Sequence, residues 1–128
     1  MKLTKNFYLH EFDCKDGNQV PHSLIPNVQL LAEQLQIVRD VVREPIFINS
    51  AWRHTEYNKA VGGSKFSQHL LAKAADITIG SMTPEEVWRL LDNMMREGYI
   101  INGGLGKYNS FCHYDVRDNE ARWDFSRR

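Results

Sequence analysis

The sequence predicts an α+β domain in which helices flank a small, mainly antiparallel sheet. Two segments carry apolar residues with the period of a helix, and short segments rich in β-branched residues lie between and after them. The 128 residues contain no internal repeat or low-complexity tract and suffice for one hydrophobic core. Residues 1–128 are therefore expected to form a single domain, with residues 1–22 as an arm that packs on it.

The first part of the chain predicts this arm and a long helix. Residues 6–22 are irregular, and their aromatic side chains are expected to pack on the main body: Phe7, Tyr8 and Phe12. A helix is expected to begin near Pro26 or Asn27 and to end at about Arg43. Its apolar face recurs at steps of three and four residues and consists of Val28, Leu31, Leu35, Val38 and Val42.

The middle of the chain predicts two strands with a short helix between them. Pro45 ends the first helix, and the β-branched and aromatic residues at 46–52 predict a strand. Residues 55–61 predict a short helix that ends at the glycine pair 62–63. The apolar run at 74–79 predicts the second strand.

The clearest helix boundary lies at Thr83. This residue is the expected N-cap, Pro84 fits the first helical position, and Glu86 completes a capping box. Gly98 is expected just after the last turn. The expected buried face consists of Val87, Leu90, Leu91 and Met94.

The remaining residues predict two further strands, at 99–101 and 110–116. The glycine-rich segment 102–106 between them does not open a convincing helix, which argues against a phosphate-binding loop. Its glycines are expected to allow a close approach of the backbone at the wall of a cleft.

Charge and composition exclude several classes of protein. Sixteen Lys and Arg balance sixteen Asp and Glu, so nothing indicates a nucleic-acid interface. The N-terminus lacks the apolar core of a signal peptide, and no run reaches membrane-spanning length. A monomer that is cytoplasmic as synthesised and does not insert into membranes is expected. Cys14 and Cys112 are far apart and are expected to be buried or half-buried thiols rather than a disulfide.

A histidine and an aspartate seven residues apart, followed by a distant histidine, predict a catalytic zinc site. His69 lies in a turn-like stretch, and Asp76 lies inside an apolar strand where a carboxylate needs a partner. With His113 they supply three N/O ligands, which leave one coordination position for water. The alternative is that each is an ordinary surface or core residue. The other histidines, His10, His22 and His54, lack such neighbours and are expected on the surface.

Two further groups are candidates for the site. On a strand, His113, Asp115 and Arg117 share one face, while Cys112 points to the other and is excluded as a ligand. By itself this polar face could also be a solvent-facing edge strand. Arg53 follows the strand at 46–52 and could bind a substrate carboxylate or carbonyl oxygen, or could simply pair with Glu56.

These residues belong to a set of motifs that together resemble the zinc peptidases of family M15, and most closely the short M15 domains of phages and prophages. The motifs are Glu11 to Cys14, Ile48 to Arg53, Asn58 to Gly63, Ser67 to Asp76, Gly103 to Tyr108 and Phe111 to Arg117. The resemblance implies a hedgehog/D,D-peptidase fold with Zn²⁺ on His69, Asp76 and His113. Arg53, Ser67 and Gln68 are then expected to bind substrate.

The implied activity is hydrolysis of peptide bonds in peptidoglycan stem peptides, by a carboxypeptidase or an endopeptidase that uses a zinc-activated water. Two positions depart from the family pattern. Ala72 stands where glycine is common, and Ser110 stands where many relatives carry a general-base glutamate. Asp115 is therefore the candidate base, or alternatively a residue that orients His113. If it is the base, Asp115→Asn is expected to reduce hydrolysis strongly with zinc retained.

The departure at Ser110 leaves a second function open. The chain could be a non-catalytic zinc domain that binds cell wall or serves in a virion. A metal-dependent nuclease is disfavoured by the neutral net charge and by the ligands of a single metal.

Overall fold

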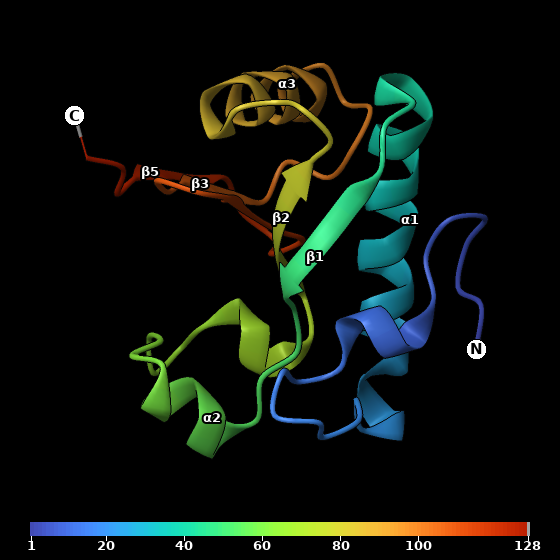
Figure 1. Ribbon diagram of the computed structural model, residues 1–128, viewed down its shortest axis with the longest axis vertical. Helices are drawn as coiled ribbons and strands as arrows, with labels where there is room; N and C mark the ends of the chain where they lie inside the picture. Colours follow the sequence, from blue (N-terminus) through green and yellow to red (C-terminus); the bar gives the residue numbers. More distant parts are fainter. Residues whose placement is uncertain (128) are drawn as a thin grey trace.

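The computed structural model describes residues 1–127 and confirms the α+β prediction (Figure 1). Its helices and strands, in chain order, are α1 (Ile25–Val42), β1 (Ile46–Ser50), α2 (Thr55–Ala60), β2 (Ala74–Ile79), α3 (Pro84–Arg96), β3 (Gly104–Lys107), β4 (Cys112–Asp115) and β5 (Ala121–Asp124). Three short 3-10 helices join them: η1 (Leu9–Phe12), η2 (His22–Leu24) and η3 (Gln68–Leu71). In Figure 1, α1 runs beside β1, while α3 and α2 lie at opposite ends of the molecule.

The strands form one five-stranded sheet in the order β1-β2-β4-β3-β5. Every neighbouring pair is antiparallel except β3 and β5, which run parallel. The sheet is therefore mainly antiparallel, as predicted. Strand β2 lies near its centre and is buried along almost its whole length.

Helix α3 has the ends that the sequence predicted. Thr83 Oγ1 accepts a hydrogen bond from Glu86 N, and a Glu86 carboxylate oxygen accepts one from Thr83 N, so the capping box is complete. Gly98 follows the C-cap with φ +83°, a conformation that glycine adopts without strain. The fully or nearly buried face of α3 consists of Val87, Leu91, Met94 and Met95.

The C-terminal part of the sheet differs from the prediction. The strand expected at 99–101 is wrong, because those residues form a bend and an irregular segment after α3. The strand lies instead at β3, which overlaps the glycine-rich segment 102–106 that was expected to form the wall of a cleft. Strand β5 was not expected at all. Three of the six residues from Gly103 to Tyr108 are glycines, so this strand lacks the alternating pattern by which strands are predicted.

The N-terminal arm is folded onto the body of the protein. Phe7 and Phe12 are buried in the core, whereas Tyr8 is exposed, contrary to the expectation that all three aromatics would pack inside. Trp52 N donates a hydrogen bond of 3.0 Å to Phe12 O, which fastens the arm to the segment after β1. Cys14 and Cys112 are both buried thiols, as predicted. Within residues 1–127, no helix combines the length and apolar character needed to cross a membrane.

Candidate metal centre

One row of residues crosses all five strands and places the candidate site on a single face of the sheet. Ser50 is paired with Asp76, Asp76 with His113, His113 with Gly106, and Gly106 with Trp123. Because paired residues project to the same face, the side chains of Asp76, His113 and Trp123 lie side by side. Cys112 and Tyr114 project to the opposite face and are buried in the core, as the alternation predicted.

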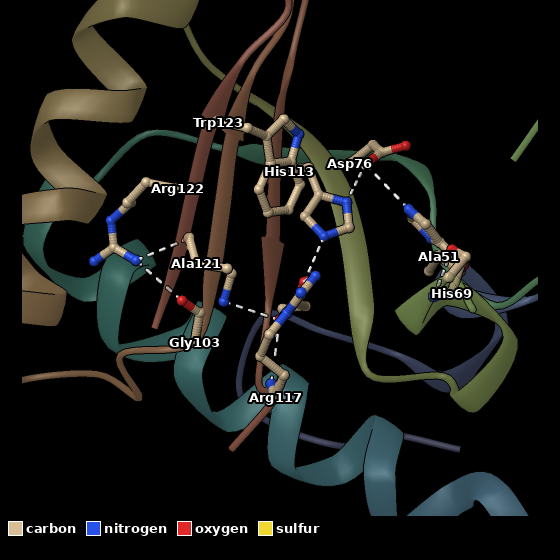
Figure 2. A network of polar contacts seen from close by, with 12 residues as sticks. Ala51, His69, Asp76, Gly103, His113, Arg117, Ala121, Arg122 and Trp123 are labelled. Carbon is tan, nitrogen blue, oxygen red and sulfur yellow. Dashed lines mark hydrogen bonds and ion pairs between the residues drawn. The ribbon is translucent and has the colours of Figure 1, made fainter. Parts of the chain in front are cut away.

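Gly106 determines how Trp123 meets His113. A methyl group at Gly106 would lie 2.2 Å from Trp123 Nε1, so the indole occupies the space that a side chain on β3 would take. The indole lies next to the imidazole of His113 (Figure 2), and their ring centroids are 5.0 Å apart. The glycine in this strand therefore lets the wall of the site be formed by a residue of β5.

His69 reaches the same place from η3. Ser67 caps this short helix by accepting a hydrogen bond from His69 N. His69 Nδ1 lies 2.6 Å from the carbonyl oxygen of Ala51. Because a carbonyl oxygen can only accept, Nδ1 carries the proton, and the lone pair of Nε2 faces Asp76 Oδ1 at 3.2 Å.

In His113 the roles of the two ring nitrogens are reversed. Its Nε2 lies 2.7 Å from Asp115 Oδ2, and its Nδ1 lies 3.2 Å from Asp76 Oδ1. The fully buried carboxylate of Asp115 also accepts hydrogen bonds from Gly104 N and from the guanidinium of Arg117. These donors keep it ionised, so it accepts the proton of Nε2 and leaves the lone pair of Nδ1 directed at Asp76.

Three lone pairs therefore converge on one point. His69 Nε2, His113 Nδ1 and an oxygen of Asp76 all lie within 4.8 Å of one another, and all three residues are buried (Figure 2). When both imidazoles are neutral, these tautomers leave no hydrogen between the three atoms, so either an added proton or a cation must lie between them. Such a set of buried acceptors is satisfied by a cation, and two imidazoles with one carboxylate suit a divalent metal.

The electrostatics of the carboxylates agree with this arrangement. Burial raises the pKa of Asp76, but hydrogen bonds and charge interactions with His113 and His69 outweigh it and hold the pKa well below its usual range. The pKa of Asp115 is likewise depressed, because hydrogen bonds from His113 and Arg117 outweigh its burial. Both carboxylates are therefore anionic at neutral pH.

Arg53 borders this centre and pairs with Asp76, not with Glu56. Its Nη2 lies 3.3 Å from Asp76 Oδ2, the oxygen that faces away from the imidazoles. Nε donates to Ser50 Oγ, and Nη1 donates to the buried Asn58. The guanidinium is thus fixed beside the candidate metal ligands.

The centre opens into a cleft of about 800 Å³. Arg53 and Ser67 line it together with the three converging residues, but Gln68 does not. Ser110 is exposed and also lies outside the lining. Among the described residues that line the cleft, Asp76 is the sole carboxylate.

The position of Asp115 fits the orienting role rather than the role of a base. Its carboxylate contacts the nitrogen of His113 that points away from the convergence point, and it does not line the cleft. A general base must reach the proton that it abstracts, directly or through one water. Asp115 is separated from the cleft by the imidazole ring that it holds.

Sequence reasoning missed two aromatic residues of the cleft, Trp123 and Tyr108. Trp123 Nε1 donates a hydrogen bond of 3.0 Å to the hydroxyl of Tyr108, and both residues line the cleft. The Trp123 ring also lies under the guanidinium of Arg117 at 5.3 Å. No local signal could have placed Trp123 here, because its position depends on the pairing of β3 with β5.

Comparison with known families agrees with the motifs and with the geometry. No curated protein matches the chain significantly. A family model described as Peptidase M15 matches residues 5–115, which include all three converging residues. Members of this family are peptidases and are generally metal-dependent. The chain belongs to the peptidase M15 family.

Proposed function

We propose that this protein is a zinc peptidase that hydrolyses peptide bonds in the stem peptides of peptidoglycan. The observation that carries the proposal is the convergence of three buried lone pairs from His69, Asp76 and His113 at the base of a cleft. Membership of the M15 family supports peptide hydrolysis. The choice of peptidoglycan rests on the resemblance to short M15 domains that act on cell walls.

The residues fit a zinc ion. Two nitrogen ligands and one oxygen ligand are a common protein set for catalytic zinc, with the remaining position left for water. When bound, zinc lowers the pKa of its water to about 7 and polarises the scissile carbonyl. The second nitrogen of each imidazole already donates to a fixed acceptor, Ala51 O or Asp115, as is typical of histidines that bind metal.

Two cleft residues can act directly on a peptide substrate. Arg53 is held by Asp76, Asn58 and Ser50 and presents a fixed positive charge to a carboxylate or carbonyl oxygen. The hydroxyl of Tyr108 accepts a hydrogen bond from Trp123, so its own hydrogen is free to donate to substrate oxygen.

One observation favours a second candidate, a non-catalytic zinc domain that binds cell wall or serves in a virion. Among the described residues, the cleft contains no carboxylate besides Asp76 that could accept a proton from water. The hydroxyl at the exposed Ser110 cannot replace a glutamate. This protein could therefore retain the metal and the cleft without turnover.

Digestion of purified peptidoglycan separates the two functions. The metal-loaded protein is incubated with peptidoglycan, and newly formed amino groups are counted with and without a chelator. Release that the chelator abolishes, and that is lost in His113→Ala but kept in the exposed-site control His22→Ala, supports the peptidase. Binding to peptidoglycan without release supports the non-catalytic domain. Mass spectrometry of the fragments identifies the bond and distinguishes endopeptidase from carboxypeptidase products.

A further inference from the structure

A second cluster of metal-binding side chains lies where the N-terminal arm meets the segment after β1. It consists of Cys14, Asp16 and His54, each of which offers a ligand atom within 4.8 Å of the others. We propose that these residues form a second metal site, which binds a borderline-soft divalent cation of the Zn²⁺ type. The proposal is independent of the site at His69, Asp76 and His113 and of the peptidase activity.

A tight turn presents the first two ligands. Cys14 N donates a hydrogen bond of 2.9 Å to Asn18 O, and Gly17 N donates one of 2.9 Å to Cys14 O. Gly17 has φ +98°, which closes the turn without strain because glycine has no Cβ. The closed turn directs the thiol of Cys14 and the carboxylate of Asp16 to the same place.

The third ligand comes from a distant part of the chain. His54 is the N-cap of α2, and its Nε2 lies 2.5 Å from Asp16 Oδ2. A metal at ordinary Zn–S and Zn–N bond lengths holds its ligand atoms about 3.5 Å apart. A small outward movement of the exposed Asp16 carboxylate is therefore enough to admit the ion between the three ligands.

Two backbone donors lie against the sulfur of Cys14 and can stabilise a metal-bound thiolate. Burial and the Asp16 carboxylate raise the pKa of the Cys14 thiol, whereas hydrogen bonds from the backbone N–H groups of Asp16 and His54 lower it in part. Such donors stabilise a thiolate, which is the form of cysteine that coordinates a metal. A thiolate, an imidazole and a carboxylate suit zinc, whereas Ca²⁺ and Mg²⁺ prefer oxygen ligands alone.

Binding requires a proton to move on His54. At present Nδ1 accepts a hydrogen bond of 3.3 Å from Tyr57 N, so Nε2 carries the hydrogen that Asp16 accepts. On coordination through Nε2, the imidazole hydrogen lies on Nδ1, and the thiol proton of Cys14 is released to solvent. The contacts given up are the long one to Tyr57 N and the hydrogen bond from Nε2 to Asp16, and the metal ion bridges His54 and Asp16 in place of the second. The side-chain amide nitrogen of Asn18 lies 3.3 Å from His54 Nε2 and donates a hydrogen bond of 2.9 Å to Asp16 Oδ2, so the remaining coordination position is left to water.

The site would fasten the arm to the body of the protein. His54 directly follows Arg53, the cation beside the first metal centre, and Cys14 lies in the arm. An ion held by both segments ties residues that are forty positions apart in the chain. Its role is therefore structural, since no cleft residue takes part in it.

Substitution with Co²⁺ provides the test, because only this second site contains sulfur. The full chain is freed of metal with a chelator and titrated with Co²⁺, and the near-ultraviolet band of sulfur-to-cobalt charge transfer is recorded. The band is expected to appear in the wild-type protein and to be lost in Cys14→Ser. It is expected to remain in the matched control Cys112→Ser, whose thiol lies elsewhere and donates to Pro84 O.

Two further variants guard against misfolding and against confusion with the first site. His54→Asn removes the imidazole but retains a good N-cap residue, and it is expected to abolish the band while α2 persists. His113→Ala is expected to keep the band while it loses Co²⁺ from the first centre. The proposal is overturned if the wild-type protein shows no sulfur band at saturating Co²⁺, or if the band survives in Cys14→Ser.

Discussion

Two hydrogen bonds, each to the imidazole nitrogen that faces away from Asp76, distinguish His69 and His113 from ordinary buried histidines and make them candidate metal ligands. Ala51 O fixes the proton of His69 on Nδ1, and Asp115 fixes that of His113 on Nε2. Each hydrogen bond fixes the orientation of the imidazole ring in advance, so the ring loses no further rotational freedom when its other nitrogen binds a metal. Asp115 should therefore affect the metal and not only the reaction.

Replacement of Asp115 by Asn tests this role. The amide cannot hold the Nε2 proton of His113 with a negative charge, so metal affinity is expected to fall about 10- to 100-fold. Competition with a chromophoric chelator measures the affinity, and circular dichroism verifies the fold. Asp118→Asn, at an exposed position on the same segment, is the control and should bind as the wild type does. Unchanged metal affinity with lost hydrolysis would instead restore Asp115 as a base.

The backbone conformation at Ala72 explains why glycine suits this position, where the chain departs from the family pattern. Ala72 ends η3 with φ +58°, a left-handed conformation that costs an alanine about 1–2 kcal/mol. Ala72→Gly relieves this strain and loses a buried methyl group, so the two effects nearly cancel. Ala74→Gly, at an equally buried position in β2, loses its methyl group without relieving any strain. It should therefore be more destabilising than Ala72→Gly by about 1 kcal/mol or more. Urea denaturation of both variants measures the difference, and equal losses would contradict a left-handed conformation at Ala72.

At the scale of the strand, the glycines of β3 make room for side chains of its neighbours. A Cβ at Gly104 would meet the carboxylate of Asp115 at 2.3 Å, and one at Gly106 would meet the indole of Trp123 at 2.2 Å. Because these two positions of β3 have no side chain, Asp115 can accept a hydrogen bond from Gly104 N and Trp123 can contact His113.

A double-mutant cycle tests this packing. Gly106→Ala is expected to destabilise the wild-type protein by about 1–3 kcal/mol, because the added methyl group displaces the indole. In the Trp123→Ala background the same substitution should change the free energy of unfolding by about 0.5 kcal/mol or less, since the clashing ring is absent. Chemical denaturation of the four proteins gives the coupling energy. Additive effects would show that the indole does not lie over Gly106.

The contrast between α3 and β3 explains how far the sequence could predict the structure. The boundaries of α3 depend on Thr83, Glu86 and Gly98, which act within one turn of the chain, and the prediction was correct. Strand β3 owes its existence to pairing with β4 and β5, and its glycines give no apolar pattern. The candidate ligands His69, Asp76 and His113 could be chosen from residue type and spacing, but Trp123 could be placed only by the register of the sheet.

At the scale of the whole molecule, the sheet and the arm bring two sets of ligands together from distant parts of the chain. The first centre joins η3, β2 and β4, and the proposed second site joins the arm to α2. Metal binding at either place therefore stabilises the folded chain over the unfolded one. At a free metal concentration one hundred times the Kd, one site contributes about 2.7 kcal/mol.

The pH dependence of stability should reveal the occupied first centre. In the metal-free protein, burial lowers the pKa of His113, but hydrogen bonds to Asp115 and Asp76 outweigh it and raise the pKa. That raised pKa stabilises the fold fully below about pH 6.5, and the effect is lost as the pH rises through the folded value. The depressed pKa values of Asp76 and Asp115 stabilise the fold above about pH 3.9, and this effect is lost as the pH falls.

The metal-free protein should thus be most stable between about pH 4 and 6.5. When Zn²⁺ is present, the cation takes the place of the proton between His113 and Asp76, so the loss of stability above this range should disappear. Thermal unfolding measured across pH, with Zn²⁺ or with a chelator, checks the shift. The comparison is made in the Cys14→Ser background, which removes the proposed second site; there His113→Ala should show little difference above neutral pH, because the group that exchanges its proton for the metal is gone. A wild-type profile that Zn²⁺ leaves unchanged would show that the three buried lone pairs do not bind a cation.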